Sequence, residues 1–383
     1  MRSEMSPHPT RPATVAPSDQ VLSRPPAEPS RRRFLAGAAG VAAGVAAAPL
    51  WPSDRAHAAA GWQAQTFPNS SSSPSVNEAV VGIQASGPAD AWAVGLVGAA
   101  PVLGRWDGSK WTKVAAPAVG GSISGSGTGD VWVGDGSKTM HWNGSAWTEV
   151  AVPAAPQDWF YNGNGHVDTG SPGTAWLLSG LSYVYGPTSD HREQVFRWGG
   201  SGWVRTPHPG TDGYDRLRGL SAVGTTAWVV GGTVSSYVMS WNGTGWTRHD
   251  LPTGGAGLKV WSYAVAAVAQ DQVWVAGDLV KDDMSSVESY LARWDSKTWR
   301  RVPVPTGGRV ARLYDLGGSV LLHTQSHHGA GRDALFRGSG GAWQELPPLS
   351  GGDGQVFAGV PGGGVWAGGS HNYVTPTTAL HTG

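Results

Sequence analysis

In the stretch Asp90-Ala91-Trp92-Ala93-Val94-Gly95, side chains alternate with a period of two, as is typical of a β-strand. A second stretch, Trp106-Asp107-Gly108-Ser109-Lys110-Trp111, places a tryptophan on each side of an Asp-Gly turn, a strong signal for a β-hairpin. The two patterns alternate along the chain after residue 60. The first pattern recurs around Trp132, Trp176, Trp228, Trp274 and Trp366, with a version that lacks tryptophan at Leu321.

The spacing of the first pattern predicts the fold. From Trp92 to Trp366 its mean period is about 46 residues, near the length of a four-stranded propeller blade. Seven copies predict an all-β fold, a seven-bladed β-propeller. The hairpin pattern is altered at Phe336/Trp343 and breaks off at residues 379–383. It is complete at Trp106/Trp111, Trp142/Trp147, Trp198/Trp203, Trp241/Trp246 and Trp294/Trp299.

The missing outer strand of the last blade is predicted at the start of the mature chain. Residues 61–68, with Trp62 and Phe67-Pro68, resemble the outer-strand sequence that runs from Trp111 to Pro117. We expect this N-terminal strand to complete the last blade and close the ring, because an open sheet edge would invite aggregation.

Composition restricts the partners and the chemistry. The chain contains 58 Gly, 27 Pro and 21 Trp, with 14% charged residues, which suits short strands joined by many turns. A formal net charge of zero argues against nucleic acid or an anionic membrane surface as a partner. The absence of cysteine excludes disulfides, thiolate sites and a lipid-modified cysteine. We therefore expect an unanchored monomer without a cofactor.

Residues 1–58 are predicted to be an export signal with a Pro- and Ser-rich leader. Ser30-Arg31-Arg32-Arg33-Phe34-Leu35 resembles the twin-arginine pattern, an apolar stretch follows to Leu50, and Ala56-His57-Ala58 supplies a small-x-small cleavage site. The alternative is a disordered leader with an accidental arginine run. We expect a secreted protein, with the propeller formed by residues 59–383.

The repeat resembles that of the kelch family. A Gly231-Gly232 doublet follows the second strand, Trp241 and Trp246 occupy the third and fourth strands, and Pro252 follows. This resemblance implies a fold and a tendency to bind rather than a reaction. Galactose oxidase has a kelch-like propeller, but its Cys–Tyr cofactor is excluded by the absence of Cys. Sialidase-type Asp boxes are also disfavoured, because Asp-Gly and Asn-Gly are adjacent in this repeat.

Most of the tryptophans are explained by the fold. Each repeated Trp can bury roughly 150 to 250 Å², which blade packing requires. Sugar stacking by the repeated Trp pairs, as in Trp-rich propeller lectins, is the alternative. Outside the repeat and the signal only Trp159 and Trp261 remain.

The predicted binding face is the one onto which the long loops between blades open. Counting back thirteen residues from a second-strand Trp predicts that Asp215, Trp261 and Asp353 begin innermost strands. Arg216 and Arg309 are predicted to lie one position further along. Glu78 is one residue out of this register. Aromatic platforms beside polar groups suit a carbohydrate or peptide. The predicted ligand-binding residues are Glu78, Trp159, Tyr161, Asp215, Arg216, Trp261, Tyr263, Arg309, Asp353, His371 and Tyr373.

Two chemical alternatives remain. His323, His327 and His328 could bind a metal, but no well-spaced carboxylate completes the set, so we expect no metal site. If Glu78, Asp215 and Asp353 acted as general acid and base, the protein would be a secreted polysaccharide hydrolase or lyase. We instead expect a non-enzymatic binding propeller, with a glycan or cell-wall polymer as the favoured ligand and a protein partner as the next choice.

Export should depend on the arginine pair. The double substitution Arg31→Lys, Arg32→Lys should leave the protein inside the cell, because paired arginines are what the twin-arginine translocase reads. Immunoblots of cell and culture fractions would measure this. Unchanged secretion of the double variant would reject the route.

Overall fold

The computed structural model describes residues 61–68, 78–97, 100–115, 119–184, 191–208, 216–232, 235–305, 308–326, 332–339, 341–349, 353–371 and 375–382. Within these ranges, 28 strands form seven four-stranded antiparallel sheets. No apolar helix of membrane-spanning length occurs in this part of the chain. The predicted signal and leader, residues 1–58, lie outside the described residues.

Each sheet is one blade, whose four strands follow one another from the innermost to the outermost. Blade one contains β2 (Glu78–Gly87), β3 (Asp90–Val97), β4 (Ala100–Trp106) and β5 (Trp111–Val114). Blade two contains β6 (Ser122–Gly127), β7 (Asp130–Gly134), β8 (Thr139–Trp142) and β9 (Trp147–Val150). Blade three contains β10 (Trp159–Ser171), β11 (Thr174–Tyr183), β12 (His191–Trp198) and β13 (Trp203–Arg205). Blade four contains β14 (Leu217–Val223), β15 (Thr226–Gly231), β16 (Tyr237–Trp241) and β17 (Trp246–Asp250).

The remaining blades have the same arrangement. Blade five contains β18 (Lys259–Ala269), β19 (Gln272–Val280), β20 (Ser286–Trp294) and β21 (Trp299–Arg301). Blade six contains β22 (Arg309–Asp315), β23 (Val320–Gln325), β24 (Ala334–Ser339) and β25 (Ala342–Glu345). Blade seven contains β26 (Asp353–Gly359), β27 (Val365–His371), β28 (Thr375–His381) and β1 (Trp62–Thr66).

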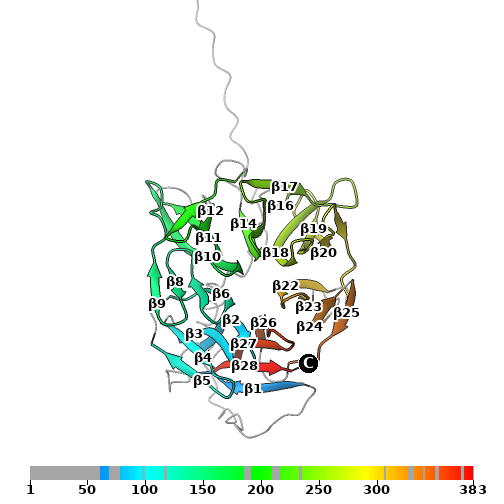
Figure 1. Cartoon of the computed structure of the whole chain (residues 1–383). Helices are drawn as coiled ribbons and strands as arrows, with labels where there is room; N and C mark the ends of the chain where they lie inside the picture. Colours follow the sequence, from blue (N-terminus) through cyan, green and yellow to red (C-terminus); the bar gives the residue numbers. More distant parts are fainter. Residues whose placement is uncertain are drawn as a thin grey trace, which may run out of the picture. The chain divides into compact units, whose positions relative to one another are not determined.

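The innermost strands follow one another around a ring (Figure 1). Each contacts the innermost strand of the next blade, and β26 of blade seven contacts β2 of blade one. The predicted all-β, seven-bladed β-propeller is therefore confirmed.

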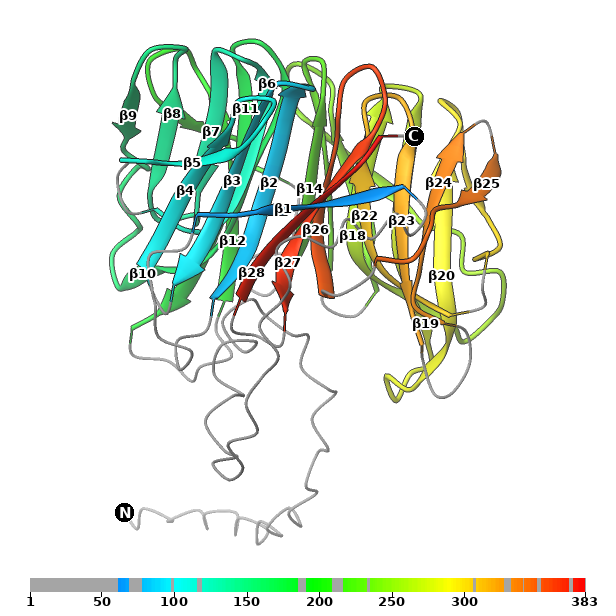
Figure 2. The same cartoon turned by 90° about the horizontal axis from the view of Figure 1, so that it is seen from below.

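The last blade is closed by the N-terminal strand, as predicted. Strand β1 pairs antiparallel with β28, with Trp62 opposite His381, and the two strands lie side by side in Figure 2. Trp62 is 5% exposed and packs among Leu321, Phe357 and their apolar neighbours. Its indole N–H donates to the carbonyl oxygen of Pro347 at 2.9 Å.

The blades are joined by tryptophans. The second-strand Trp92 of blade one packs against both hairpin tryptophans of blade two, Trp142 and Trp147, with 5.2 Å between ring centroids in each case. Such tilted and edge-to-face geometries are the favoured ones for aromatic pairs. The same arrangement joins blade two to three, three to four, four to five, and seven to one.

Short Asx turns hold the hairpins. Oδ1 of Asp107 accepts the backbone N–H groups of Ser109 and Lys110 at 2.9 Å, and Gly108 has a φ of 96°, a conformation that favours glycine. Asn143 and Asn242 make the same pair of bonds in blades two and four. These turns hold each pair of hairpin tryptophans in place.

Side chains accept hydrogen bonds from some of the backbone N–H groups at the inner edge of the ring. An innermost strand has no neighbouring strand on the side of the channel. The backbone N–H groups on that side therefore need acceptors outside the sheet. The N–H of Thr169 donates to Ser124 Oγ at 3.1 Å, and the N–H of Ala267 donates to Ser221 Oγ at 3.0 Å. Each acceptor belongs to the preceding blade, so these bonds join neighbouring blades at the channel.

Trp62→Ala should lower the free energy of unfolding of the mature protein by about 3 to 5 kcal/mol, because it empties a buried site in the closing strand. Deletion of residues 61–67 should have a larger effect, because it also opens the ring. Thermal and denaturant unfolding would measure both. Gln63→Ala is the matched control, since Gln63 is exposed on the same strand. Unchanged melting of the deletion variant would show that terminal pairing does not support the ring.

Candidate functional site

The innermost strands begin at one face of the ring, and we call their starting ends the mouth. The pairing of six of these strands is interrupted near this end. In β10 two extra residues lie between Tyr161 and Gly165, and in the other five strands one extra residue forms a β-bulge. A bulge turns a side chain away from the regular alternation, as is common beside binding sites. The bulged residues are Val81, Arg218, Tyr263, Ala311 and Gln355.

Blade four meets blade five through a cation–π contact. The guanidinium of Arg218, the bulged residue of β14, lies 3.8 Å from the ring centroid of Trp261 in β18. Both side chains are partly exposed. Such a contact contributes roughly 0.5 to 2 kcal/mol and fixes the plane of the guanidinium.

Blade five meets blade six through a second charged contact. Arg309, the first residue of β22, pairs with both carboxylate oxygens of Asp278, at 2.9 Å to Oδ2 and 3.3 Å to Oδ1. Its guanidinium also lies 4.8 Å from the ring of Tyr263, whose hydroxyl donates to the carbonyl oxygen of Val310 at 2.5 Å. Burial alone would lower the pKa of Arg309, but Tyr263 and Asp278 raise it above its ordinary value, so the guanidinium stays charged.

These five residues form one continuous group, which we call the mouth cluster: Arg218, Trp261, Tyr263, Asp278 and Arg309. Trp261 lies directly opposite Asp278 in the β18–β19 ladder, so the two contacts share a strand pair. Strands β14, β18 and β22 are consecutive around the ring (Figure 1). The cluster joins aromatic rings to fixed charges, which suits a polar ligand with flat faces.

Blade three adds a separate aromatic pair. Trp159 packs against Tyr183 with 5.3 Å between ring centroids, and the guanidinium of Arg192 lies 4.5 Å from the Trp159 ring. The hydroxyl of Tyr161 donates to the carbonyl oxygen of Pro153 at 2.5 Å, and burial raises the pKa of that hydroxyl against the opposing charge of Arg205. Tyr161 thereby holds the connection from blade two.

Glu78 begins β2 of blade one and is 1% exposed. Neither of its carboxylate oxygens has a hydrogen-bond partner among the described residues. Desolvation raises the pKa of Glu78 above its ordinary value. Glu78 belongs to a different part of the ring from the mouth cluster, because its strand β2 contacts the innermost strands of blades two and seven.

The predicted count of thirteen residues places Trp261 in the right strand but two residues after its start at Lys259, and the count is wrong for blade four. The residue opposite the second-strand Trp lies eight positions before it in blade five (Ala266, Trp274) but seven before it in blade four (Ser221, Trp228). The connection between the strands is one residue shorter in blade four. The carbonyl oxygen of Arg216 accepts the N–H of Gly232, so Arg216 occupies the same position in blade four that Trp261 occupies in blade five.

Arg309 is level with Trp261 for the same reason, since Tyr314 lies only seven positions before Leu321 in blade six. The prediction that Arg216 and Arg309 lie one position further along than the rim residues is thus corrected. Asp215 and Tyr373 lie outside the described residues. Asp353 and His371 begin β26 and end β27, and their side chains lie outside the described part of the structure.

Sequence reasoning missed Arg218 and Asp278. Asp278 replaces the second glycine of the doublet that blade four keeps as Gly231-Gly232. A charged residue at a position where the repeat prefers glycine was the available signal. Arg218 had no comparable signal, because its direction depends on the bulge.

The histidines form no metal site in the described structure. No group of three or more His, Asp or Glu suited to a metal ion occurs among the described residues. His323 lies in β23 against Phe357, and burial lowers its pKa to about 4, so it is neutral at pH 7. His327 and His328 lie outside the described ranges.

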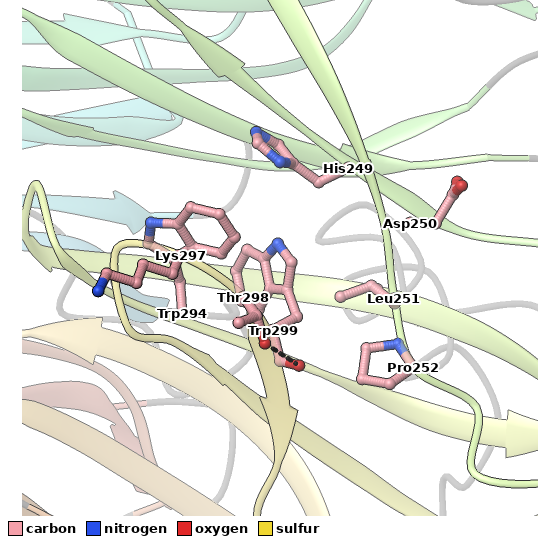
Figure 3. A pocket seen from close by; sticks show the side chains of 8 residues that line it. All are labelled: His249, Asp250, Leu251, Pro252, Trp294, Lys297, Thr298 and Trp299. Carbon is pink, nitrogen blue, oxygen red and sulfur yellow. Dashed lines mark hydrogen bonds between the residues drawn. The ribbon is translucent and has the colours of Figure 1, made fainter.

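A shallow hollow of about 450 Å³ lies between the outer parts of blades four and five (Figure 3). Trp299 and Leu251 form its buried floor, Trp294 is partly exposed, and Asp250 and Lys297 lie at its edge. The two tryptophans are those that pack on Trp228. The hollow is therefore a by-product of blade packing.

Deeper in the channel, Asp168 lies on β10 opposite the second-strand Trp176. It accepts hydrogen bonds from Ser124 Oγ at 2.6 Å and from the backbone N–H of Ala222 at 3.0 Å. Desolvation nevertheless raises the pKa of Asp168 to about 6, with a contribution from the charge of Asp315. Asp168 thus joins blades two, three and four.

Neither a protein-family model nor a curated protein matches this sequence. Oligogalacturonate lyase from Vibrio parahaemolyticus is similar in structure, with a TM-score of 0.56, 10% identity, and coverage of 84% of this chain and 98% of that one. Oligogalacturonate lyase in complex with manganese is similar with a TM-score of 0.57 and 12% identity, and the match covers 85% of this chain and 98% of that one. YCF48 bound to D1 peptide is similar with a TM-score of 0.54 and 15% identity, and the match covers 84% of this chain and 96% of that one.

At such low identities, these similarities show the fold alone: a seven-bladed β-propeller. The kelch-like repeat stays a prediction, as does the twin-arginine signal.

The raised pKa of Asp168 predicts a pH-dependent stability. A folded-state pKa near 6, above the ordinary 3.8, stabilises the protein fully below pH 3.8, and this contribution is lost as the pH rises through 6. Relative to Asp168→Asn, the wild type should lose roughly 1 to 3 kcal/mol of unfolding free energy between pH 4 and pH 7.

Denaturant unfolding of both proteins at several pH values would measure the difference. Asp107→Asn is the control, because hydrogen bonds from Ser109 and Lys110 lower the pKa of Asp107 to about 2, which leaves its contribution constant over this range. A constant difference between the wild type and Asp168→Asn would contradict the assignment.

Proposed function

We propose that this chain is an exported, non-enzymatic binding propeller whose ligand is a glycan or cell-wall polymer held at the mouth. The observation that carries the proposal is the mouth cluster. Its partly exposed Trp261 and Tyr263 each lie beside a guanidinium, and both guanidiniums are fixed by contacts across blade boundaries. Preorganised polar groups beside aromatic rings are typical of sites that recognise sugars.

The charge arrangement also favours binding over catalysis. A general acid or base needs a carboxylate that is free to exchange a proton. Asp278, the carboxylate of the cluster, is paired with Arg309 through both oxygens. Both oxygens of Asp278 are therefore occupied by the guanidinium of Arg309.

A secreted polysaccharide hydrolase or lyase is the second candidate. Glu78 favours it, because its carboxyl is buried and desolvation raises its pKa, as is typical of a general acid. In that case Asp215 and Asp353 would supply further carboxyl groups at the mouth. A protein partner is the remaining possibility for the binding function.

Purified residues 59–383 should bind immobilised polysaccharides or a glycan array without releasing products. Trp261→Ala should weaken that binding about tenfold or more, because it removes an aromatic surface and the support of Arg218. Val204→Ala is the matched control, since Val204 is 57% exposed on an outer strand. Melting curves would show that both variants are folded.

Product analysis distinguishes the second candidate. Turnover of a polysaccharide that Glu78→Gln, Asp215→Asn or Asp353→Asn abolishes would replace the binding function by a catalytic one. Capture of a protein by the mouth, with no glycan bound, would reject a glycan ligand.

A further inference from the structure

Blades four to six contribute four arginines to the described part of the mouth. Arg216 and Arg218 come from blade four, and Arg309 and Arg312 come from blade six. Arg216 and Arg312 are exposed, and within the described ranges neither has an ion-pair partner. In the described part of the mouth, two exposed guanidiniums therefore lie beside the cluster without an ionic partner.

Arg312 faces the central channel. Both faces of a blade are covered by neighbouring blades, so an exposed side chain in the middle of an innermost strand points towards the channel. Arg312 pairs with His323 in the ladder and Arg309 pairs with Gln325, which places Arg312 deeper than Arg309. The arginines of blade six thus extend from the rim into the channel.

Three other cations near this face are paired with carboxylates. Lys259 Nζ lies 2.9 Å from Asp282, and Arg301 forms an ion pair with Glu288. Arg309 is likewise paired with Asp278. Arg216 and Arg312 differ from these three cations, in a chain whose formal net charge is zero.

The inner edges of the blades are poorly suited to an added peptide strand. Strand addition requires a row of free backbone N–H and C=O groups. The N–H groups of Val167, Thr169, Ala222, Ala267 and Val310 are already donated to side-chain oxygens. A ligand at the mouth must therefore be read by side chains.

We propose, on the basis of the proposed function, that the ligand is an acidic polysaccharide whose carboxylates are bound by Arg216 and Arg312. A guanidinium binds a carboxylate through two parallel N–H donors, which both exposed arginines can offer. The terminal nitrogens of Arg218 are buried, so Arg218 supports the ring of Trp261 rather than the ligand. Repeated carboxylates along a uronate chain match two guanidiniums that lie on blades four and six.

The test compares an oligouronate of about six sugars with the same oligomer methyl-esterified, using calorimetric titration of residues 59–383. The free acid should bind at least about tenfold more tightly at low salt, and its affinity should fall as salt rises from about 50 to about 300 mM. The double variant Arg216→Ala, Arg312→Ala should remove most of that preference. The double variant Arg248→Ala, Arg300→Ala is the control, because it removes two positive charges from outermost strands, where Arg248 pairs with Asp250 and Arg300 pairs with Asp295.

The outcomes separate the two proposals. Equal, salt-insensitive binding of the acid and its ester would overturn the acidic ligand and leave a glycan-binding function. Failure of neutral and acidic glycans alike would overturn both. Tighter binding of poly-glutamate than of the oligouronate would show that the mouth reads acidic polypeptide instead, which also overturns the inference.

Discussion

The insertion of one tryptophan between two others is the interaction on which the ring depends. A four-stranded sheet has two apolar faces and cannot bury either alone, so each blade is stable only against its neighbours. Trp92, Trp132, Trp176 and Trp366 are at most 1% exposed, which shows that the contact is complete. Because Trp366 of blade seven packs between Trp106 and Trp111 of blade one, the chain of contacts closes on itself.

Blade six shows how the ring tolerates a departure from this rule. Leu321 replaces the second-strand tryptophan, and the register places Gly338, not the predicted Phe336, at the position of the first hairpin tryptophan, opposite Trp343. Both residues are buried, and Leu321 packs with Trp62 of the closing strand. The N-terminal strand therefore supplies both the missing sheet edge and an aromatic ring at the boundary with the least aromatic blade.

The sequence was sufficient for the fold and only partly sufficient for the site. The spacing of tryptophans predicts seven blades, and the similarity of residues 61–68 to the outer strand at Trp111 predicts the closure. These features follow from side-chain type and period. The level of each residue at the mouth depends in addition on bulges and on strand connections that differ by one residue, as in blade four. Neither is encoded in a period, which is why Trp261 was placed in the right strand and Arg218 was missed.

Packing and recognition compete for the same residue type in this molecule. The second-strand tryptophans are buried between the blades, since even Trp228 and Trp274 are only 3% exposed. Outside the repeat, Trp159 and Trp261 supply tryptophan surface, and in both cases a guanidinium covers part of the ring. A flat ligand that approaches either ring at the mouth therefore meets positive charge at the same time. Stacking and charge recognition are coupled by this geometry, so a ligand that satisfies only one of them leaves part of the available binding energy unused.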